Sequence, residues 1–475
     1  MIHDLFSILL PQTCLGLFII FQLILSMTLP VQYYKWSRLI SVIGITASIL
    51  LLSTVQIEPQ YFGFKNSIMS DSYTQLFHFI IMFCGFFVVL LSDNLIKTVK
   101  HNAYSFQALL LTAILGAMTV VSANDILTLF ISLEILSFST YFLIATPNGY
   151  LSKEASFKYL ITSAVSSGVF LFGASYLYGQ TLTLNLNEIY EIIVSKQHSP
   201  LFAFSGIMIS LGLISKLAVF PFANWILDVY KGCEISVLAF LTTIPKLALF
   251  GILCRLIIFP LGGTLELTIC LILLSLITAF WANVYAIKEK NIKVILACSS
   301  AANAAYVLIA ASIVSVYNLS AVLFYLICYV ILNIAVFAFL NILESHNIKM
   351  YIDELKGFGK SNVGISLAYT IAVIGLAGIP ITSGFVAKIY LFSAIAHAGL
   401  IFIPFLIILL VLTVVALYYY LKLIFPLFQI SENSKLLKPT FSQKVVLLIT
   451  IAITILIGIY PERLIELCKY IAYNI

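Results

Sequence analysis

Charged side chains are scarce in this sequence. Aspartate, glutamate, lysine and arginine together make up 9% of the 475 residues, against roughly 25% in an ordinary soluble domain. The formal net charge of +6 is spread over short loops, so it forms no basic patch of the kind that binds nucleic acid. The composition therefore excludes a large soluble domain and gives no indication of a nucleic-acid partner.

Motifs for redox cofactors and metals are also missing. The eight cysteines are widely spaced, without a CxxC pair or a Cys/His cluster, and the sequence has no GxGxxG. We therefore expect the cysteines to be small apolar packing residues, with no bound metal and no redox cofactor on this chain. The first residues, MIHDLFSILL, lack the basic segment and cleavage site of a signal peptide, which predicts a retained first transmembrane helix.

Long apolar segments dominate the rest of the sequence. Hydrophobic residues make up 62% of the chain, and the mean hydropathy is +1.11. A helix of roughly 20 residues crosses the hydrocarbon core of a bilayer. Segments of this kind predict an all-α polytopic membrane protein of about 14 transmembrane helices, near residues 5–28, 38–55, 71–91, 105–122, 125–146, 157–178, 202–222, 234–257, 265–287, 292–315, 318–341, 364–394, 400–426 and 444–460.

Lysine and arginine are distributed unevenly between the loops that join these spans. Loops after odd-numbered spans hold most of them, whereas loops after even-numbered spans hold only Lys65, Lys196 and Arg255. Loops rich in lysine and arginine face the cytoplasm or its topological equivalent. This asymmetry predicts that both termini lie on the non-cytoplasmic side. The full set of spans without a transit peptide favours a bacterial inner membrane.

Four charged residues nevertheless lie inside apolar spans. They are Glu134 in LFISLEILSF, Lys216 in GLISKLAVFPF, Lys246 in LTTIPKLALFG and Lys388 in GFVAKIYLF. A charge at the bilayer centre costs about 3 kcal/mol even on lenient insertion scales. Four retained charges therefore favour transport of a small cation, most simply the proton, over anchoring.

A pair formed by Glu134 and Lys216 has two interpretations. At an effective dielectric constant near 20, an ion pair at 4 Å is worth about 4 kcal/mol, so forming or breaking the pair can gate the loading of a proton on the lysine. The alternative is a static ion pair that fixes helix packing. For Lys246 and Lys388 the alternative is snorkelling to a membrane interface.

Two of the expected spans are interrupted by proline. Pro221 follows Lys216 closely, and Pro380 stands in GLAGIPITSG, shortly before Lys388. Proline removes a backbone donor and clashes with the preceding turn, so each break frees backbone groups that protein or water must satisfy. A packing kink is the simple alternative. Two breaks, each close to a buried lysine, favour the discontinuous helices of a transporter built from two related halves.

Five sequence runs occur in an order that is known from one family. They are LFISLEILSFSTYFL, ISKLAVFPFANWILDVYKG, VLAFLTTIPKLALFG, NIKVILACSS with YVLIA, and LAGIPITSGFVAKIYLF. Together they resemble the antiporter-like membrane subunits of complex I. Within that group, DVYKG and the fourteen spans are most similar to the subunit N branch of bacterial NADH:quinone oxidoreductase, the homologue of mitochondrial and chloroplast subunit 2.

The resemblance implies a fold of two inverted five-helix repeats, with helices 7 and 12 discontinuous. Mapped onto this sequence, it gives three N-terminal helices in residues 1–100, a first repeat of helices 4–8 in 101–257, a second repeat of helices 9–13 in 258–430, and helix 14 with a C-terminal tail in 431–475.

The resemblance also implies a proton path. Glu134, Lys216, Lys246 and Lys388 match the relay residues of the family. Glu134 corresponds to the carboxylate of the fifth helix, and Lys216 to the lysine beside the broken seventh helix. Lys246 then takes the position of the central relay, and Lys388 faces the opposite half-channel.

Supporting residues carry over in the same way, with one departure. Pro221 and Pro380 match the helix breaks, and Asp228 matches the aspartate after the seventh helix, with a structural or water-access role. Where many relatives have a histidine in the tenth helix, this chain has Asn303. Asparagine cannot hold a proton at neutral pH, although it can orient a water molecule. We therefore expect the relay to run through water or Tyr306 at this point.

The function implied by the resemblance is that of a proton-translocating membrane subunit of a respiratory NADH:quinone oxidoreductase. Its partners are then the other membrane and peripheral subunits of complex I, which are expected to carry the flavin, the iron–sulfur clusters and the quinone. Two alternatives remain, a subunit of a multi-subunit sodium/proton antiporter and a non-pumping structural subunit of complex I. The identity of the partners distinguishes an antiporter subunit from a complex I subunit. Lysine mutants distinguish a structural subunit from one that pumps protons.

Overall fold

The computed structural model of the chain describes residues 2–55, 61–147, 149–195, 200–258, 261, 264–429 and 436–475. Lys196 lies outside the described residues. By its internal packing the chain divides into two compact units, the first made of residues 1–218, 243–270 and 473–475 and the second of 219–242 and 271–472. The division into two inverted repeats at residues 257 and 258 stays a prediction.

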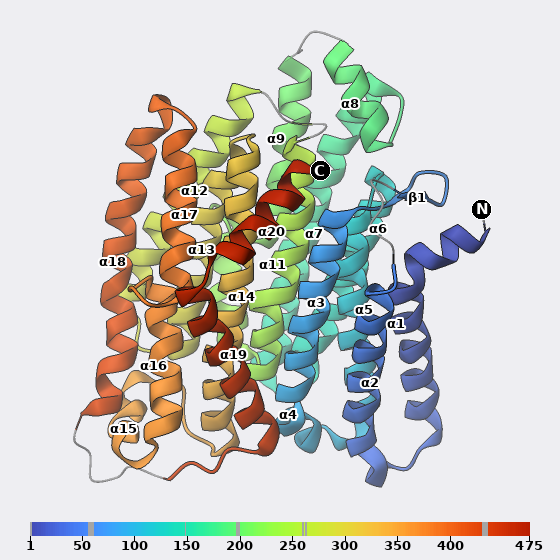
Figure 1. The fold of residues 1–475 in the computed structure, drawn as a ribbon. Coiled ribbons are helices and arrows are strands. Elements are labelled where there is room, and N and C mark those ends of the chain that lie inside the picture. The colour runs from blue at the N-terminus through green and yellow to red at the C-terminus, as the bar shows by residue number, and fades with distance from the viewer. Residues whose placement is uncertain are drawn as a thin grey trace. The chain divides into compact units, whose positions relative to one another are not determined.

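The first unit consists of helices and one short hairpin. Its long helices are α1 (Ile2–Thr28), α2 (Tyr34–Leu52), α3 (Ser72–Leu91), α5 (Ala103–Ser122), α6 (Ile126–Ala145), α7 (Tyr150–Thr181) and α9 (Pro200–Lys216). Its shorter elements are α4 (Asp93–Thr98), α8 (Leu186–Ser195) and the antiparallel strands β1 (Tyr61–Gly63) and β2 (Ile68–Ser70). Within this unit α5 packs against α1, α3 and α6, and α7 packs along α9 (Figure 1).

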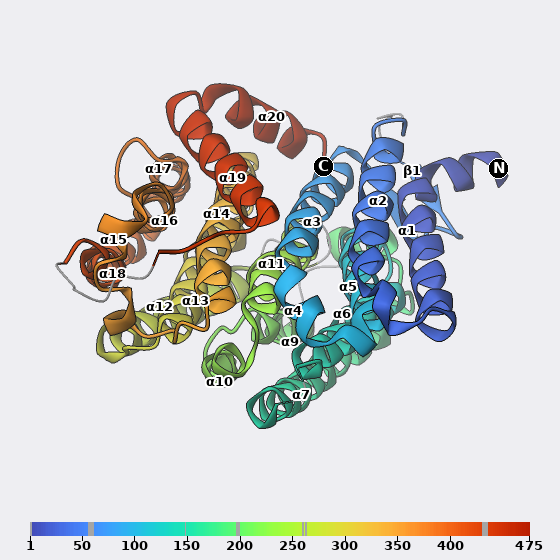
Figure 2. The same cartoon turned by 90° about the horizontal axis from the view of Figure 1, so that it is seen from below.

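The second unit is built around a buried helix. Its helices are α10 (Trp225–Gly232), α13 (Ile292–Ser312), α14 (Val316–Ser345), α15 (Phe358–Ser361), α16 (Val363–Ala377), α17 (Ser383–His397), α18 (Ile403–Phe428), α19 (Phe441–Ile459) and α20 (Glu462–Tyr473). The apolar windows of α13 and α14 are completely buried. Figure 2 shows α14 beside α13, α17 and α19, and α16 also packs against it. Helices α11 (Ile235–Ile258) and α12 (Leu265–Lys288) contribute residues to both units.

The expected transmembrane helices are present. In the described part of the chain, twelve helices are long and apolar enough to cross a membrane, and α9 and α16 are shorter apolar helices. Together they match the fourteen predicted spans, with α16 and α17 as the two halves of the twelfth. The prediction of an all-α polytopic membrane protein is confirmed.

Both predicted helix breaks are also present. Helix α9 ends at Lys216, Ala218 has a φ of 61°, and the peptide bond before Pro221 is cis. Between α16 and α17 the backbone turns through Gly378 at φ 82° and Ile381 at φ 77°. A residue with positive φ cannot continue a right-handed helix. These residues therefore lie just after the ends of α9 and α16, where each break begins.

One cation lies in a different environment from the one expected. Arg255 is not a loop residue, because it lies inside α11 and its side chain is 2% exposed. Its Nη2 donates to Oδ2 of Asp71 at 2.7 Å, and its guanidinium lies 5.0 Å from the ring centroid of Tyr73. Asp71 is also the N-cap of α3, where it accepts from the backbone N–H of Thr74. This buried ion pair ties the start of α3 to α11.

Candidate functional site

Glu134 and Lys216 meet inside the first unit. Glu134 lies on α6 and Lys216 is the last residue of α9, so two different helices place the charges. The Nζ atom of Lys216 is 3.7 Å from Oε1 of Glu134, and the lysine side chain is 6% exposed against 22% for the glutamate. The two groups therefore attract one another at a distance too long for a direct hydrogen bond.

Serine hydroxyls surround this pair. Lys216 donates from Nζ to Oγ of Ser137 at 2.8 Å and to Oγ of Ser163 at 3.0 Å. Ser167 donates from Oγ to Oε1 of Glu134 at 2.5 Å. Each charged group thus has uncharged partners at hydrogen-bond distance, and the ion pair can lengthen or shorten without leaving either group without a partner.

The three serines were missed in the sequence interpretation. Ser137 stands three residues after Glu134 on α6, and Ser163 and Ser167 stand four apart on α7. Residues three and four apart share one face of a helix. This spacing was the available signal, but serine is so common in apolar helices that it indicates a polar face only once a buried charge is known to lie opposite.

Lys246 lies in the middle of α11 and belongs to the same unit as Glu134 and Lys216. Its side chain is enclosed by protein, with the residue 5% exposed, so snorkelling does not describe its position. Pro245 precedes it within the helix and removes one backbone donor from the helical ladder.

Lys388 on α17 has the end of a helix as its partner. Its Nζ donates to the carbonyl oxygen of Ala377 at 2.8 Å, and Ala377 is the last residue of α16. The ammonium also lies 5.9 Å from the ring centroid of Tyr306. The C-terminal end of a helix carries a partial negative charge, so the break in the twelfth span supplies the group that stabilises this buried cation.

Gly378 makes that contact possible. Its φ is 82°, a backbone conformation that residues other than glycine adopt only at an energetic cost. A Cβ atom at this position would stand 2.6 Å from Cδ of Lys388. The break therefore needs glycine both for the turn of the backbone and for the close approach of the lysine stem.

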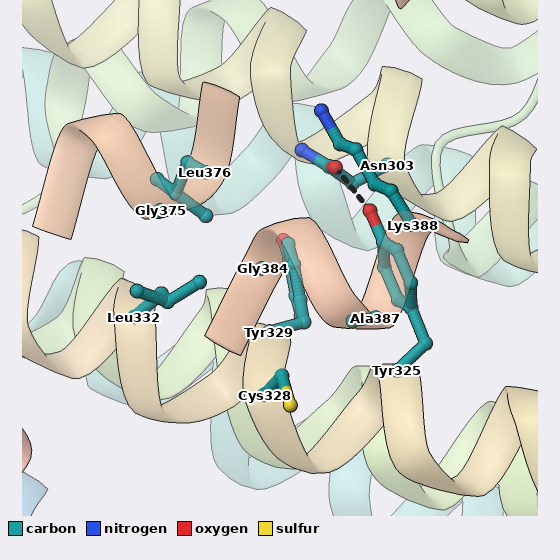
Figure 3. Close-up of a pocket in the computed structure, with 10 residues that line it drawn as sticks. All are labelled: Asn303, Tyr325, Cys328, Tyr329, Leu332, Gly375, Leu376, Gly384, Ala387 and Lys388. Carbon is teal, nitrogen blue, oxygen red and sulfur yellow. Dashed lines mark hydrogen bonds between the residues drawn. The ribbon is translucent and has the colours of Figure 1, made fainter. Parts of the chain in front are cut away.

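Asn303 on α13 is held by hydroxyl groups on two sides. Its Nδ2 donates to the carbonyl oxygen of Ser299 at 2.8 Å and to the hydroxyl of Tyr420 at 3.1 Å. Its Oδ1 accepts from the hydroxyl of Tyr325 at 2.6 Å (Figure 3). Asn303 is therefore bonded to the hydroxyls of Tyr420 and Tyr325, whereas Tyr306 presents its ring to Lys388. A relay through water or Tyr306 at this point stays a prediction.

A small cavity joins Asn303 and Lys388 within the second unit. Asn303, Tyr325, Tyr329 and Lys388 are among the residues that line it (Figure 3). It leaves about 10 Å³ for the centre of a water molecule, which is close to the space that one water needs. The cavity offers such a water both donors and acceptors.

The remaining predicted residues lie at the edges of these groups. Asp228 is exposed on α10, in the second unit. Pro221 lies in the break after α9, and Pro380 is exposed in the break between α16 and α17. The structure thus places Glu134, Lys216 and Lys246 in one unit and Asp228, Asn303, Tyr306 and Lys388 in the other.

The chain is similar to the proteins of a known family. Residues 123–415 match the family described as NADH:quinone oxidoreductase/Mrp antiporter, transmembrane. The chain is 31% identical to the NADH-quinone oxidoreductase subunit N of Anoxybacillus flavithermus over 441 residues, which cover 89% of this chain and 88% of the relative. It is also 31% identical to subunit N 1 of Thermodesulfovibrio yellowstonii over 414 residues, or 86% of this chain and 88% of the relative.

Solved structures give the same result. A chain of respiratory complex I from Thermus thermophilus with bound aureothin superimposes with a TM-score of 0.82 at 27% identity, covering 96% of this chain and 98% of the other. A chain of the Mrp complex from Dietzia sp. shares the fold, with a TM-score of 0.81 at 18% identity, covering 100% of this chain and 98% of the other. The chain belongs to the NADH:quinone oxidoreductase/Mrp antiporter membrane family. The resemblance to the antiporter-like subunits of complex I is confirmed.

Proposed function

We propose that this chain is a proton-translocating membrane subunit of an NADH:quinone oxidoreductase, of the subunit N type. The observation that carries the proposal is the Glu134–Lys216 pair, which lies among serine hydroxyls with its two charged groups 3.7 Å apart. The relatives named NADH-quinone oxidoreductase subunit N support the assignment.

In this proposal the ammonium of Lys216 moves between two arrangements. When Glu134 and Lys216 approach, the carboxylate stabilises the charged lysine, by about 4 kcal/mol at 4 Å and an effective dielectric constant near 20. When they separate, Ser137 and Ser163 still accept hydrogen bonds but bring no negative charge. The proton is then held in the first arrangement and released in the second, with Lys246 and Lys388 as the later relay positions.

Electron transfer belongs to other subunits in this proposal. This chain acts as the translocase part of the enzyme and performs no redox chemistry, while flavin, iron–sulfur clusters and quinone are bound by its complex I partners. We place it in a bacterial inner membrane with both termini on the non-cytoplasmic side, because the loops after odd-numbered spans hold most of its lysines and arginines.

The test compares proton uptake by sealed membrane vesicles that contain assembled complex. Lys216→Ala and Glu134→Gln should retain NADH oxidation by the peripheral subunits and lose most proton uptake. Lys158→Ala is the matched control, because Lys158 on α7 is half-buried and forms its ion pair with Glu154 on the same helix. Normal proton uptake by either relay variant in assembled complexes would exclude the proposed role.

The alternatives are separated by what co-purifies with the chain. A tag on this chain and mild detergent should recover flavin and iron–sulfur subunits in one native complex. Recovery of small antiporter subunits alone would identify a sodium/proton antiporter instead. If complex I subunits co-purify and the lysine variants still pump normally, this chain is a structural subunit of the complex.

A further inference from the structure

Asn303 separates two groups of proton-exchanging side chains in the second unit. On one side the hydroxyls of Ser299 and Tyr420 are 2.5 Å apart. On the other side lies the cavity shared by Lys388 and Tyr325. The side chain of Asn303 is bonded to both groups, to Tyr420 through its nitrogen and to Tyr325 through its oxygen.

The amide cannot pass a proton between these groups. A hydroxyl can accept one proton while it gives up another, but the amide nitrogen only donates and the amide oxygen only accepts. Here the nitrogen donates to Ser299 and Tyr420, and the oxygen accepts from Tyr325. The proton of Tyr325 thus points at a group that does not take it up, and the row of hydrogen bonds is interrupted at Asn303.

We propose that the hydrogen bond between Asn303 and Tyr325 is a closed gate between Lys388 and the hydroxyls of Ser299 and Tyr420. This inference rests on the proposed function, because a pump must keep its two half-paths from being open together. The gate opens when the bond breaks and water enters from the cavity beside Lys388.

In the open state, water connects the hydroxyls directly to Lys388. Each oxygen in the row accepts one proton and releases one, so the neutral amine of Lys388 gains a proton and the far end of the row loses one. The transfer needs no further reactant. The cavity has room for about one water molecule, so a short displacement of the Asn303 side chain is enough to complete the row.

The experiment measures passive proton conductance of the complete complex in sealed liposomes without NADH. Asn303→Ala removes the amide and leaves space for water, and it should raise the conductance roughly tenfold, as expected when one buried hydrogen bond no longer maintains the barrier. Asn303→Leu fills the same space with an apolar side chain and should remain as tight as the native chain. Adding Lys388→Ala to Asn303→Ala should abolish the leak.

Two results would overturn the gate. Asn303→Ala complexes that are as tight as native show that the amide is not the barrier. Equal leaks in Asn303→Ala and Asn303→Leu show that loosened packing, and not a hydrated path, carries the protons.

The gate and the proposed function fail in different ways. Normal proton uptake by Lys216→Ala would remove the proposed pumping role, whatever the conductance of the Asn303 variants. Loss of uptake in Lys216→Ala together with tight Asn303→Ala complexes would keep the pump and remove the gate.

Discussion

The ammonium of Lys388 and the carbonyl oxygen of Ala377 are joined by a 2.8 Å hydrogen bond across the break between α16 and α17. Lys216 is stabilised differently, by the carboxylate of Glu134 at 3.7 Å. The two units thus use different groups to hold a buried lysine, a side-chain charge in one and the end of a helix in the other.

Gly378→Ala should disable the second of these arrangements. The added Cβ meets the stem of Lys388, and the left-handed backbone costs alanine roughly 1–2 kcal/mol. We expect proton uptake to fall about tenfold or more in assembled complexes. Gly364→Ala, near the start of α16 and in open space, should behave as native. Normal uptake by Gly378→Ala would show that the contact is dispensable.

Removing the serines around Lys216 should trap its ion pair. In Ser137→Ala/Ser163→Ala the ammonium keeps only Glu134 as a partner, so the pair shortens and releases its proton more slowly. We expect a roughly tenfold lower pumping rate with NADH oxidation and assembly retained, the effect of about one buried hydrogen bond at each site. Ser175→Ala is the control, because Ser175 is exposed on α7 and bonds only its own helix. Unchanged pumping in the double variant would exclude a role of Ser137 and Ser163 in separating Lys216 from Glu134.

The buried pair of Arg255 and Asp71 should behave as a structural element. Arg255→Met leaves the Asp71 carboxylate uncompensated and should destabilise the subunit by about 3–5 kcal/mol. Asp71→Asn added to it removes that charge, while the amide can still cap α3, so the double variant should be more stable than Arg255→Met alone. Thermal unfolding of the purified complex followed through this subunit measures both. A double variant less stable than the single one would contradict this account.

Cys233 should resist alkylation. It lies between α10 and α11, where burial raises the pKa of its thiol to about 12. Because the thiolate is the reactive form, a raised pKa keeps the group protonated and inert at pH 8. Labelling with a maleimide, followed by mass spectrometry, should leave Cys233 unmodified and modify a cysteine introduced at the exposed Lys349. Fast labelling at Cys233 would show that the site is open to solvent.

The burial of Lys216, Lys246 and Lys388 could be predicted from the sequence, because a charge inside an apolar run is conspicuous. Their partners could not be predicted equally well. Glu134 is itself such a charge, so its pairing with Lys216 could be anticipated. The partner of Lys388 is a backbone carbonyl, which has no residue type to mark it.

Long separations along the chain hide the other contacts. Asp71 and Arg255 are 184 residues apart, and nothing in either segment indicates the other. Tyr325 is one of 26 tyrosines, and Tyr306 was closer in sequence to Asn303. The arrangement of α13 and α14 decides which hydroxyl reaches the amide, and that is a result of packing.

The different partners of the two lysines also determine the net charge of each site when it holds a proton. A protonated Lys216 beside an ionised Glu134 forms a neutral pair. A protonated Lys388 is balanced only by the partial charge of a helix end, about half an elementary charge, and in the described part of the chain it has no recorded ion pair. Moving a full charge across the membrane against 100 mV costs about 2.3 kcal/mol. Loading a proton adds one elementary charge at either lysine, so a rising membrane voltage opposes the loading of both. What differs is the charge of the loaded site, which is zero at the Lys216 pair and positive at Lys388.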